Sequence, residues 1–434
     1  MILKINKKME NKKVTFIGFK DYANVMTEYS QAINKNCDGF ESKVICECSH
    51  PINFETKHDY NLLTYIESTD EWVRNEDQIM GAKNWISESS HIIVAEEKGP
   101  QMANNPPYYY EKFGQRWQLE AMKECSNMNP NDSLRTIKDI FSNILKMDIV
   151  KDTKAGRDNN LHLYHTGTVY RTQADMFNII GSKHFNKIIH GVDLYRLSWN
   201  NLSVDEQNLL DIEKNYQPDN NLAIYTSYDR DYKKEKITKL INKKFNTNKI
   251  IIFHAPTSKE MKGTNIITSV VGGLVSFMNK KNKKFGIDVE YEYITPETYE
   301  PTKELMDPST GWIPNSEIMK IKEMAHIYVD EFNPQVGYFG GSTVEALMSG
   351  NIAFATINNF TLDAMAAANK NIKSSLCPVV HLGEDPKQFR DVLKDILEKP
   401  IDELKEMAHK SLQWYYETST HKSVATKFEK EVLL

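Results

Sequence analysis

One stretch of the sequence combines residues that bind anions with residues that begin a helix. "GYFGGSTVEALMSG" runs from Gly337 to Gly350 and places Gly340 and Gly341 directly before an expected helix start. Backbone N–H groups at a helix N-terminus, uncrowded by side chains, form a site for phosphate. Glu345, one turn into the helix, would accept hydrogen bonds from a vicinal diol such as that of a ribose. A second interpretation needs no ligand, because Ser342 and Glu345 have the S-x-x-E spacing of a capping box.

Two further stretches place polar side chains after expected strands. In "HAPTSKEMKGTNI", Lys262 and Gly263 precede a helix that Thr264 starts, so the ammonium would lie near a bound phosphate. A solvated lysine explains the same residue equally well. In "LYHTGTVYR", His165 ends a strand and Arg171 begins the next helix. A histidine there either orients a polar ligand or is a satisfied structural residue.

The first strand-to-helix loop, "GFKDYANVMTEYS", contains Gly18, Lys20 and Asn24. It has a single glycine, so the G-x-G-x-x-G dinucleotide fingerprint is absent, and the chain also lacks the P-loop pattern. H-E-x-x-H and G-x-S-x-G are missing as well. These absences speak against nicotinamide and flavin enzymes, zinc peptidases and α/β-hydrolases.

The elements that must position these residues alternate along the chain. Short apolar runs predict strands at 13–19, 91–97, 161–167, 186–192 and 221–227, with helical patterns between most of them. A lysine-rich stretch, 229–248, is interpreted as the connection between domains, with one exposed helix. After it the alternation restarts with "KIIIFHAP", "IDVEYEYIT", "HIYVD", "IAFATI" and "CPVVHL" as strands. The pattern predicts two α/β domains of similar size with parallel sheets, whose ligands bind at the carboxyl ends of the strands.

Composition narrows the class of protein. The 434 residues carry a net charge of −5, which offers no general attraction for nucleic acid or anionic lipid. The five cysteines are scattered and form no CxxC pair, which favours reduced thiols in the cytoplasm over a disulfide framework or a structural zinc site. No secretory signal and no run of 18 apolar residues is found, so we expect a soluble, cytoplasmic protein.

Taken in their order along the chain, these motifs resemble the GT-B glycosyltransferases, specifically the retaining, glycogen-synthase-like group (family 4, group 1) that uses nucleotide sugars. "IIIFHAPTSKEMKGTNIITSVV" is similar to that family's strand–loop–helix with a Lys-Gly pair. "AHIYVDEFNPQVGYFGGSTVEALMSGNIAFAT" is similar to its donor-site signature. "YHTGTVYR", "DYANVMTEYSQAIN" and the closing "ETSTHKSVATKFEKEVL" also resemble family segments. The match is thinnest from about Asn53 to Asn160.

The resemblance implies two Rossmann-like domains facing across a cleft. The acceptor-side domain would comprise residues 1–230, the nucleotide-sugar domain 231–415, and a C-terminal helix, 416–434, would return to the first domain. The implied reaction is transfer of a hexose from a UDP- or GDP-sugar to a glycan, lipid, protein or nucleic-acid-base acceptor, with retention and without a metal or other cofactor. The acceptor and the oligomeric state are not given by the sequence.

The resemblance also assigns roles to residues. Glu345 would hold the ribose of the donor, and the amides of Gly340, Gly341, Ser342 and Thr343 would bind its diphosphate. Lys262, with Gly263 and Thr264 beside it, would neutralise that diphosphate. His165 would contact the transferred sugar from the other domain. The loop of Gly18, Lys20 and Asn24, together with Arg171, would lie near the phosphates or the acceptor.

Two positions depart from the family pattern. Gly337 stands where the family's first glutamate is expected, eight residues before Glu345, and Thr257 stands where an arginine often precedes the lysine. Asp330 and Glu331 lie nearby and are candidates to replace the missing carboxylate. Two alternatives therefore stay open, a sugar-nucleotide epimerase on the same fold and a non-catalytic protein that binds a sugar nucleotide or glycan.

Overall fold

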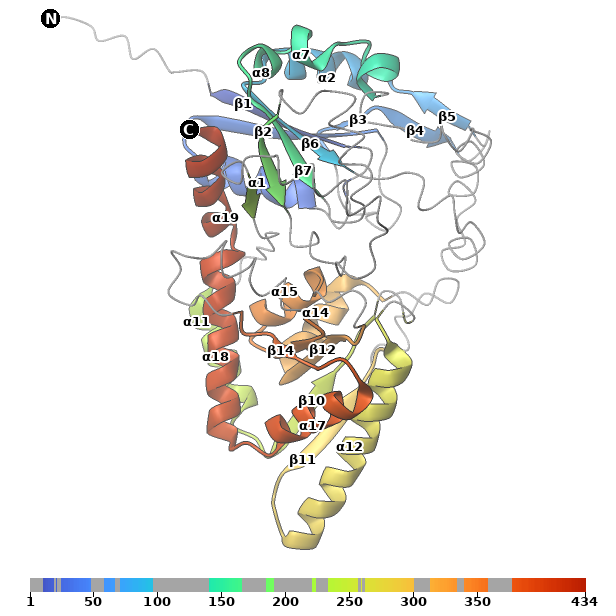
Figure 1. The fold of residues 1–434 in the computed structure, drawn as a ribbon, viewed down its shortest axis with the longest axis vertical. Coiled ribbons are helices and arrows are strands. Elements are labelled where there is room, and N and C mark those ends of the chain that lie inside the picture. The colour runs from blue at the N-terminus through green and yellow to red at the C-terminus, as the bar shows by residue number, and fades with distance from the viewer. Residues whose placement is uncertain are drawn as a thin grey trace, which may run out of the picture. The chain divides into compact units, whose positions relative to one another are not determined.

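The structure is a computed structural model that describes residues 11–18, 21, 25–47, 58–66, 71–96, 140–165, 185–190, 221–223, 233–256, 259, 262–299, 313–333, 339–357 and 377–434. These residues form two compact units, each built on its own sheet (Figure 1). The first unit contains the described residues up to 223 and the C-terminal His421–Leu434. The second contains those from 233 to 420.

The first unit is a seven-stranded parallel sheet in the order β3-β2-β1-β6-β7-β8-β9. Its strands are β1 (Lys12–Gly18), β2 (Phe40–Cys46), β3 (Tyr60–Asn61), β6 (His91–Glu96), β7 (Leu161–His165), β8 (Phe185–His190) and β9 (Asn221–Ala223). An antiparallel hairpin pairs β4 (Leu63–Ile66) with β5 (Glu71–Arg74). Its helical segments are α1 (Val25–Asn36), α2 (Glu76–Glu88), the π-helical Ile140–Leu145, α7 (Ile149–Asp152) and α8 (Lys154–Arg157).

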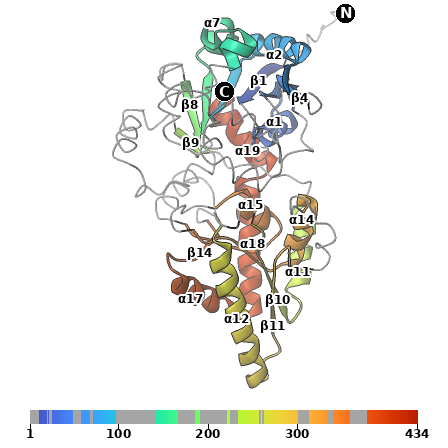
Figure 2. The same ribbon diagram turned by 90° about the vertical axis from the view of Figure 1, so that its right-hand side faces the viewer.

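The C-terminal segment belongs to the core of this first unit. Helix α19 (His421–Phe428) packs against α1, as both ribbon views show, and the π-helical Glu429–Leu433 follows it (Figure 2). Phe428 lies edge-on to Tyr29, with ring centroids 5.0 Å apart, and all of these side chains are buried with those of β1. His421 and Glu28 form a hydrogen bond of 2.8 Å that ties the start of α19 to α1.

The second unit is a five-stranded parallel sheet in the order β11-β10-β12-β13-β14. The strands are β10 (Lys249–Phe253), β11 (Glu290–Ile294), β12 (Ile327–Glu331), β13 (Ile352–Ala355) and β14 (Val380–His381). The helices are α11 (Lys234–Lys244), α12 (Thr264–Phe285), α14 (Asn315–Met324), α15 (Gly341–Met348), α17 (Pro386–Leu397) and α18 (Ile401–Thr418). Figures 1 and 2 show α12 beside α17.

Strand burial explains why the sequence folds in this way. Every residue of β12 and of β13 is buried, because a parallel strand with helices on both faces of its sheet has no exposed side. The edge strand β11 is half-exposed, and Asn279 of α12 covers part of it. The Asn279 amide donates to the Tyr291 carbonyl at 2.8 Å and accepts from the Tyr291 N–H at 2.8 Å.

The predicted α/β fold class, with two doubly wound parallel sheets, is confirmed. The interpretation of residues 229–248 as an inter-domain connection with an exposed helix is wrong for the described part of that stretch. Helix α11 buries Ile237 and Ile241 within the second unit. A Cβ at Gly350 would lie 2.5 Å from the Ile241 side chain, so this helix packs closely. The lysines that suggested a linker cover its solvent side.

The strand order also shows where ligands bind in such sheets. In the second unit the order reverses between β10 and β12, since the next strand along the chain, β11, lies on the other side of β10. In the first unit the reversal falls between β1 and β6. Open α/β sheets bind ligands at the carboxyl ends of the two strands at such a reversal. Among the described residues, no helix is long and apolar enough to cross a membrane.

Candidate functional site

The carboxyl edge of the second sheet, where β10, β12 and β13 end, receives both stretches predicted to bind the donor. The Lys262 stretch follows β10, and the Gly340 stretch follows β12. These are the two strands at which the strand order reverses. The residues around Lys262 and Gly340 therefore reach the ligand-binding position of this fold from neighbouring strands.

Gly263 fixes the position of Lys262. It is the N-cap of α12 and has φ of 64°, in the left-handed region that favours glycine. A Cβ at Gly263 would lie 2.2 Å from the Phe332 carbonyl oxygen, and the Phe332 N–H donates to the Lys262 carbonyl at 3.0 Å. The backbone of the Lys-Gly pair thus lies directly against the chain that leaves β12, which only glycine allows.

The Lys262 ammonium is held by two carboxylates. Its Nζ lies 2.9 Å from Oδ1 of Asp330 and 2.7 Å from Oε2 of Glu331, the last two residues of β12. Lys262 is 8% exposed, and both acids are almost fully buried. The interpretation of Lys262 as a solvated lysine is therefore wrong. We call these three residues the Lys262 cluster, which opposes one ammonium to two carboxylates.

Asp330 joins the Lys262 cluster to the start of α15. Its Oδ2 accepts hydrogen bonds from the Gly340 N–H at 3.1 Å and from the Thr343 hydroxyl at 2.7 Å. Burial alone would raise the pKa of the Asp330 carboxyl. The charge of Lys262 and the hydrogen bonds from Thr343, Lys262 and Gly340 outweigh burial and hold that pKa below its usual value. A single ionised side chain thus brings three predicted site residues together.

Glu345 has a cation of its own. Its Oε2 lies 2.6 Å from Nζ of Lys322, which is fully buried, and its Oε1 accepts from Nδ2 of Asn315 at 3.0 Å. Both partners come from α14. The Lys322 ammonium also donates to the Ser342 hydroxyl at 2.8 Å and to the Ser342 carbonyl at 3.0 Å. We call Glu345, Lys322 and Asn315 the Glu345 cluster.

The capping-box interpretation of Ser342 and Glu345 is wrong. Helix α15 begins at Gly341 with Gly340 as its N-cap, so Ser342 already lies inside the helix. The Ser342 hydroxyl lies 2.6 Å from the Tyr328 hydroxyl as well as beside Lys322. At the start of α15, the Gly340 N–H is used by Asp330 and the Thr343 N–H by the Gly340 carbonyl. The amides of Gly341 and Ser342 make no hydrogen bond to any residue that the structure describes.

Thr264 contributes to the layer beneath the site. Its hydroxyl lies 2.9 Å from Nε2 of His254, whose Nδ1 lies 2.8 Å from the Val329 carbonyl. Burial lowers the pKa of His254 to about 4, so the ring is neutral. It then donates from Nδ1 to the carbonyl and accepts the threonine hydroxyl at Nε2. This arrangement locks the end of β10 to the first residue of α12.

The predicted residues of the first unit are described only in part. Gly18 ends β1, and a Cβ there would lie 3.1 Å from the Met26 side chain and 3.3 Å from Ala95. His165 ends β7, where it is paired with Glu96 of β6, and its side chain lies outside the described residues. Lys20, Asn24 and Arg171 also lie outside them.

Sequence reasoning missed several residues that this edge uses. Lys322 had a signal, since it lies three residues after the buried Met319 and so on the apolar face of α14. A lysine on that face needs a buried anion. Asp21, in the first loop, is fully buried and accepts from the N–H groups of Met26 and Thr27, and burial raises its pKa to about 6. An aspartate four residues before an apolar helix was a visible capping signal.

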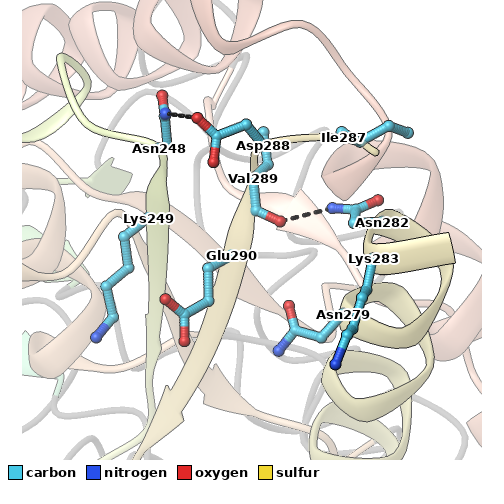
Figure 3. A pocket seen from close by; sticks show the side chains of 9 residues that line it. All are labelled: Asn248, Lys249, Asn279, Asn282, Lys283, Ile287, Asp288, Val289 and Glu290. Carbon is cyan, nitrogen blue, oxygen red and sulfur yellow. Dashed lines mark hydrogen bonds between the residues drawn. The ribbon is translucent and has the colours of Figure 1, made fainter. Parts of the chain in front are cut away.

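A second hollow, of about 400 Å³, lies at the opposite edge of the same sheet, where β10 and β11 begin (Figure 3). The Asn282 amide donates to the Val289 carbonyl at 2.7 Å, and Asn248 bonds Asp288, so several of its polar groups are already paired. Parallel sheets do not bind their ligands at this edge, and we do not assign it as the site. Within the described ranges, no group of three His, Cys, Asp or Glu side chains is arranged to hold a metal ion.

Comparisons with known proteins return only distant solved structures. No protein-family description matches the chain, and no curated protein matches it. HepE of Anabaena, solved with UDP and glucose, superposes with a TM-score of 0.47 at 9% identity, covering 97% of this chain and 99% of that one. The N-terminal domain of Candida albicans trehalose-6-phosphate phosphatase gives 0.48 at 10% identity, with 98% and 97% covered. A putative UDP-N-acetylglucosamine 2-epimerase of Listeria monocytogenes gives 0.42 at 12%, with 96% and 94% covered. Similarities this distant say nothing about what the chain binds.

Proposed function

We propose that the protein is a cytoplasmic glycosyltransferase of the GT-B type that transfers a hexose from a nucleotide diphosphate sugar, with retention and without a metal. The donor's nucleotide would bind at the carboxyl edge of the second sheet. Asp330 is the single observation that carries this proposal. Its carboxylate joins Lys262 to the start of α15, so a cation and two helix amides lie within reach of one ligand.

The proposed chemistry follows from charge. A departing nucleoside diphosphate gains negative charge as the bond to the sugar breaks. The N–H groups of Gly341 and Ser342 and the ammonium of Lys262 would stabilise that charge from fixed positions. Glu345, ionised beside Lys322, would accept hydrogen bonds from the ribose diol. His165 would contact the transferred sugar, and the loop of Gly18, Lys20 and Asn24, with Arg171, would face the phosphates or the acceptor.

A binding screen tests the proposal first. Purified protein is examined by thermal shift and calorimetry with UDP, GDP, ADP, TDP and their common sugar conjugates, with and without magnesium. We expect one nucleotide to raise the melting temperature without metal, which names the base of the donor. Conversion of the sugar nucleotide in the absence of any acceptor would favour the epimerase. Binding without turnover over a broad set of acceptors would favour a non-catalytic protein, and no response to any nucleotide would refute the proposal.

Glu345→Gln tests the ribose contact itself. Affinities are compared for the nucleoside diphosphate and for its 2′,3′-dideoxy analogue. We expect the variant to bind the diphosphate about 1.5–3 kcal/mol more weakly, the scale of a hydrogen bond to a charged group, and to lose the preference for the diol. Glu317→Gln, on the neighbouring α14, is the matched control. A lower melting temperature with unchanged diol preference would make Glu345 only the structural partner of Lys322.

A further inference from the structure

The Lys262 cluster has an excess of negative charge at the place where an anion is proposed to bind. One ammonium faces two carboxylates at 2.9 and 2.7 Å, and both acids are nearly inaccessible to water. A diphosphate that approaches this ammonium meets a position already taken by carboxylate oxygens. Adding a third anion to one buried cation is unfavourable unless a carboxylate leaves or takes up a proton.

The two carboxylates are not equivalent. Asp330 is bound at both oxygens, by Lys262 on one side and by Gly340 and Thr343 on the other, so its departure would also release the start of α15. The bond from Glu331 to Lys262 runs through Oε2, at the end of a longer side chain at the last position of β12. Glu331 can therefore be displaced without dismantling the loop around α15.

We infer that Glu331 occupies the anion position of Lys262 in the unliganded protein, and that a bound diphosphate displaces it with the uptake of one proton. The inference rests on the proposed function for the identity of the ligand. It makes Glu331 a specificity-determining residue. A ligand must bring enough charge to replace a carboxylate, so diphosphates are selected over nucleosides and singly charged anions. The affinity of the wild type then rises as the pH falls.

The charged and titratable groups around Glu331 do not account for such a proton. Lys262 precedes α12, Asp330 shares β12, and Lys322 and Glu345 face the cluster from α14 and α15. His254, at the end of β10, is neutral, with Glu297 also near it. The Tyr328 hydroxyl stays protonated, because burial raises its pKa well above 10. Above pH 7.5, where the terminal phosphate of a nucleotide is fully ionised, a proton taken up on binding would thus reside on Glu331.

The experiment is calorimetric titration of the full chain at pH 8 in Tris and in HEPES, whose ionisation enthalpies differ, so that the protons taken up are counted. The probes are UDP, or the diphosphate that the screen selects, and inorganic pyrophosphate. The proteins are the wild type, Glu331→Gln and the double variant Lys262→Met/Glu331→Gln. Glu398→Gln, which removes an exposed partner of Lys281, is the matched control. Ligand protons cancel in the comparison of the wild type with Glu331→Gln.

We expect Glu331→Gln to bind the probe about tenfold more tightly than the wild type, and to take up about one proton fewer. The double variant should lose this gain. Equal or weaker binding by folded Glu331→Gln, with an unchanged proton count, would overturn the inference even if the nucleotide binds. If Glu331→Gln does not fold, the wild type decides alone, since an affinity that is flat from pH 7.5 to 9 would also overturn it.

The two proposals fail in different ways. If no nucleotide binds the wild type but Glu331→Gln gains pyrophosphate binding through Lys262, the displacement inference stands and the glycosyltransferase proposal falls. If a nucleotide binds the wild type and Glu331→Gln brings no gain, the reverse holds. If neither protein binds either probe, both fall.

Discussion

Buried lysines at the two edges of the second sheet are used in different ways. At the carboxyl edge, Lys262 and Lys322 are paired with carboxylates at 2.6–2.9 Å. Toward the opposite edge, Lys244 of α11 is equally buried, but it donates to carbonyls, those of Ala325 at 2.7 Å and Ser349 at 3.1 Å. These carbonyls belong to the C-caps of α14 and α15. A cation at two helix C-termini complements both helix dipoles and needs no carboxylate.

This difference separates structural charge from charge that a ligand can use. Backbone carbonyls cannot move away or change their protonation, so Lys244 has one stable arrangement. Carboxylates can do both, so the pairs at the carboxyl edge have alternative states that a ligand can select. Ion pairs with exchangeable partners are thus found at the edge where this fold binds ligands.

The largest effect that this comparison predicts is on stability. Lys322→Met leaves Glu345 buried without its cation, and removal of one partner of a buried ion pair costs about 3–5 kcal/mol. Chemical denaturation measures the change in the free energy of unfolding. Lys320→Met, two residues away and exposed, is the control and should change it by less than about 0.5 kcal/mol. Equal effects of the two substitutions would mean that the Glu345 pair contributes no more than a surface contact.

The second effect is on ligand affinity. Lys262→Ala should weaken binding of a nucleoside diphosphate by about 1.5–3 kcal/mol, because it removes a charged donor to the phosphates. Calorimetry on the folded variant gives the value. Lys259→Ala, an exposed lysine that precedes the same helix and pairs with Glu297, should bind as the wild type does. Unchanged affinity of Lys262→Ala would exclude Lys262 from the site.

A smaller effect is expected at the opposite edge. Lys244→Met removes hydrogen bonds to two helix-terminal carbonyls but also relieves the burial of a charge, so we expect a loss of about 1–2 kcal/mol in the free energy of unfolding. Nucleotide affinity should stay as in the wild type. Lys243→Met, its exposed neighbour, is the control. A change in affinity in Lys244→Met would contradict the division between the two edges.

The pH dependence gives the smallest effect. Burial lowers the pKa of Lys244 to about 7, from 10.5. Between these values the unfolded chain binds more protons than the folded one, so this group makes the protein more stable as the pH rises through that window. Below pH 7 both states are protonated and its contribution is constant. The stability of the wild type relative to Lys244→Met should therefore rise by about 1 kcal/mol from pH 7 to pH 8, as measured by denaturation at each pH. A flat difference would mean that the two carbonyls keep the ammonium protonated.

Much of the fold could be predicted because burial leaves a direct record in the sequence. Runs such as "KIIIF" and "HIYVD" are apolar since helices cover both faces of the sheet, and glycines mark the ends of the strands and helices around them. The antiparallel hairpin of β4 and β5 had no comparable pattern, and α11 was misread because its two buried isoleucines are outnumbered by lysines.

The site was predicted less completely. The positions of Lys262 and Gly340 followed from their place after strands, and Gly263 had the positive φ that its position implied. The pairing of charges did not follow. Whether Lys262 faces solvent, Asp330 or Glu331 depends on how β12 lies beside β10, which no local pattern records. The partnership of Lys322 with Glu345 likewise joins two helices that are adjacent only in space.

The bonds of Asn279 to both backbone groups of Tyr291 have a consequence for association. Tyr291 lies on β11, the outer strand of the sheet, whose unpaired N–H and C=O groups would otherwise accept a strand from another molecule. A side-chain amide offers the same donor and acceptor as a peptide group, so α12 occupies that rung of the ladder from within the chain. An asparagine that looks like one more polar residue on a helix thereby protects the sheet against edge-to-edge aggregation.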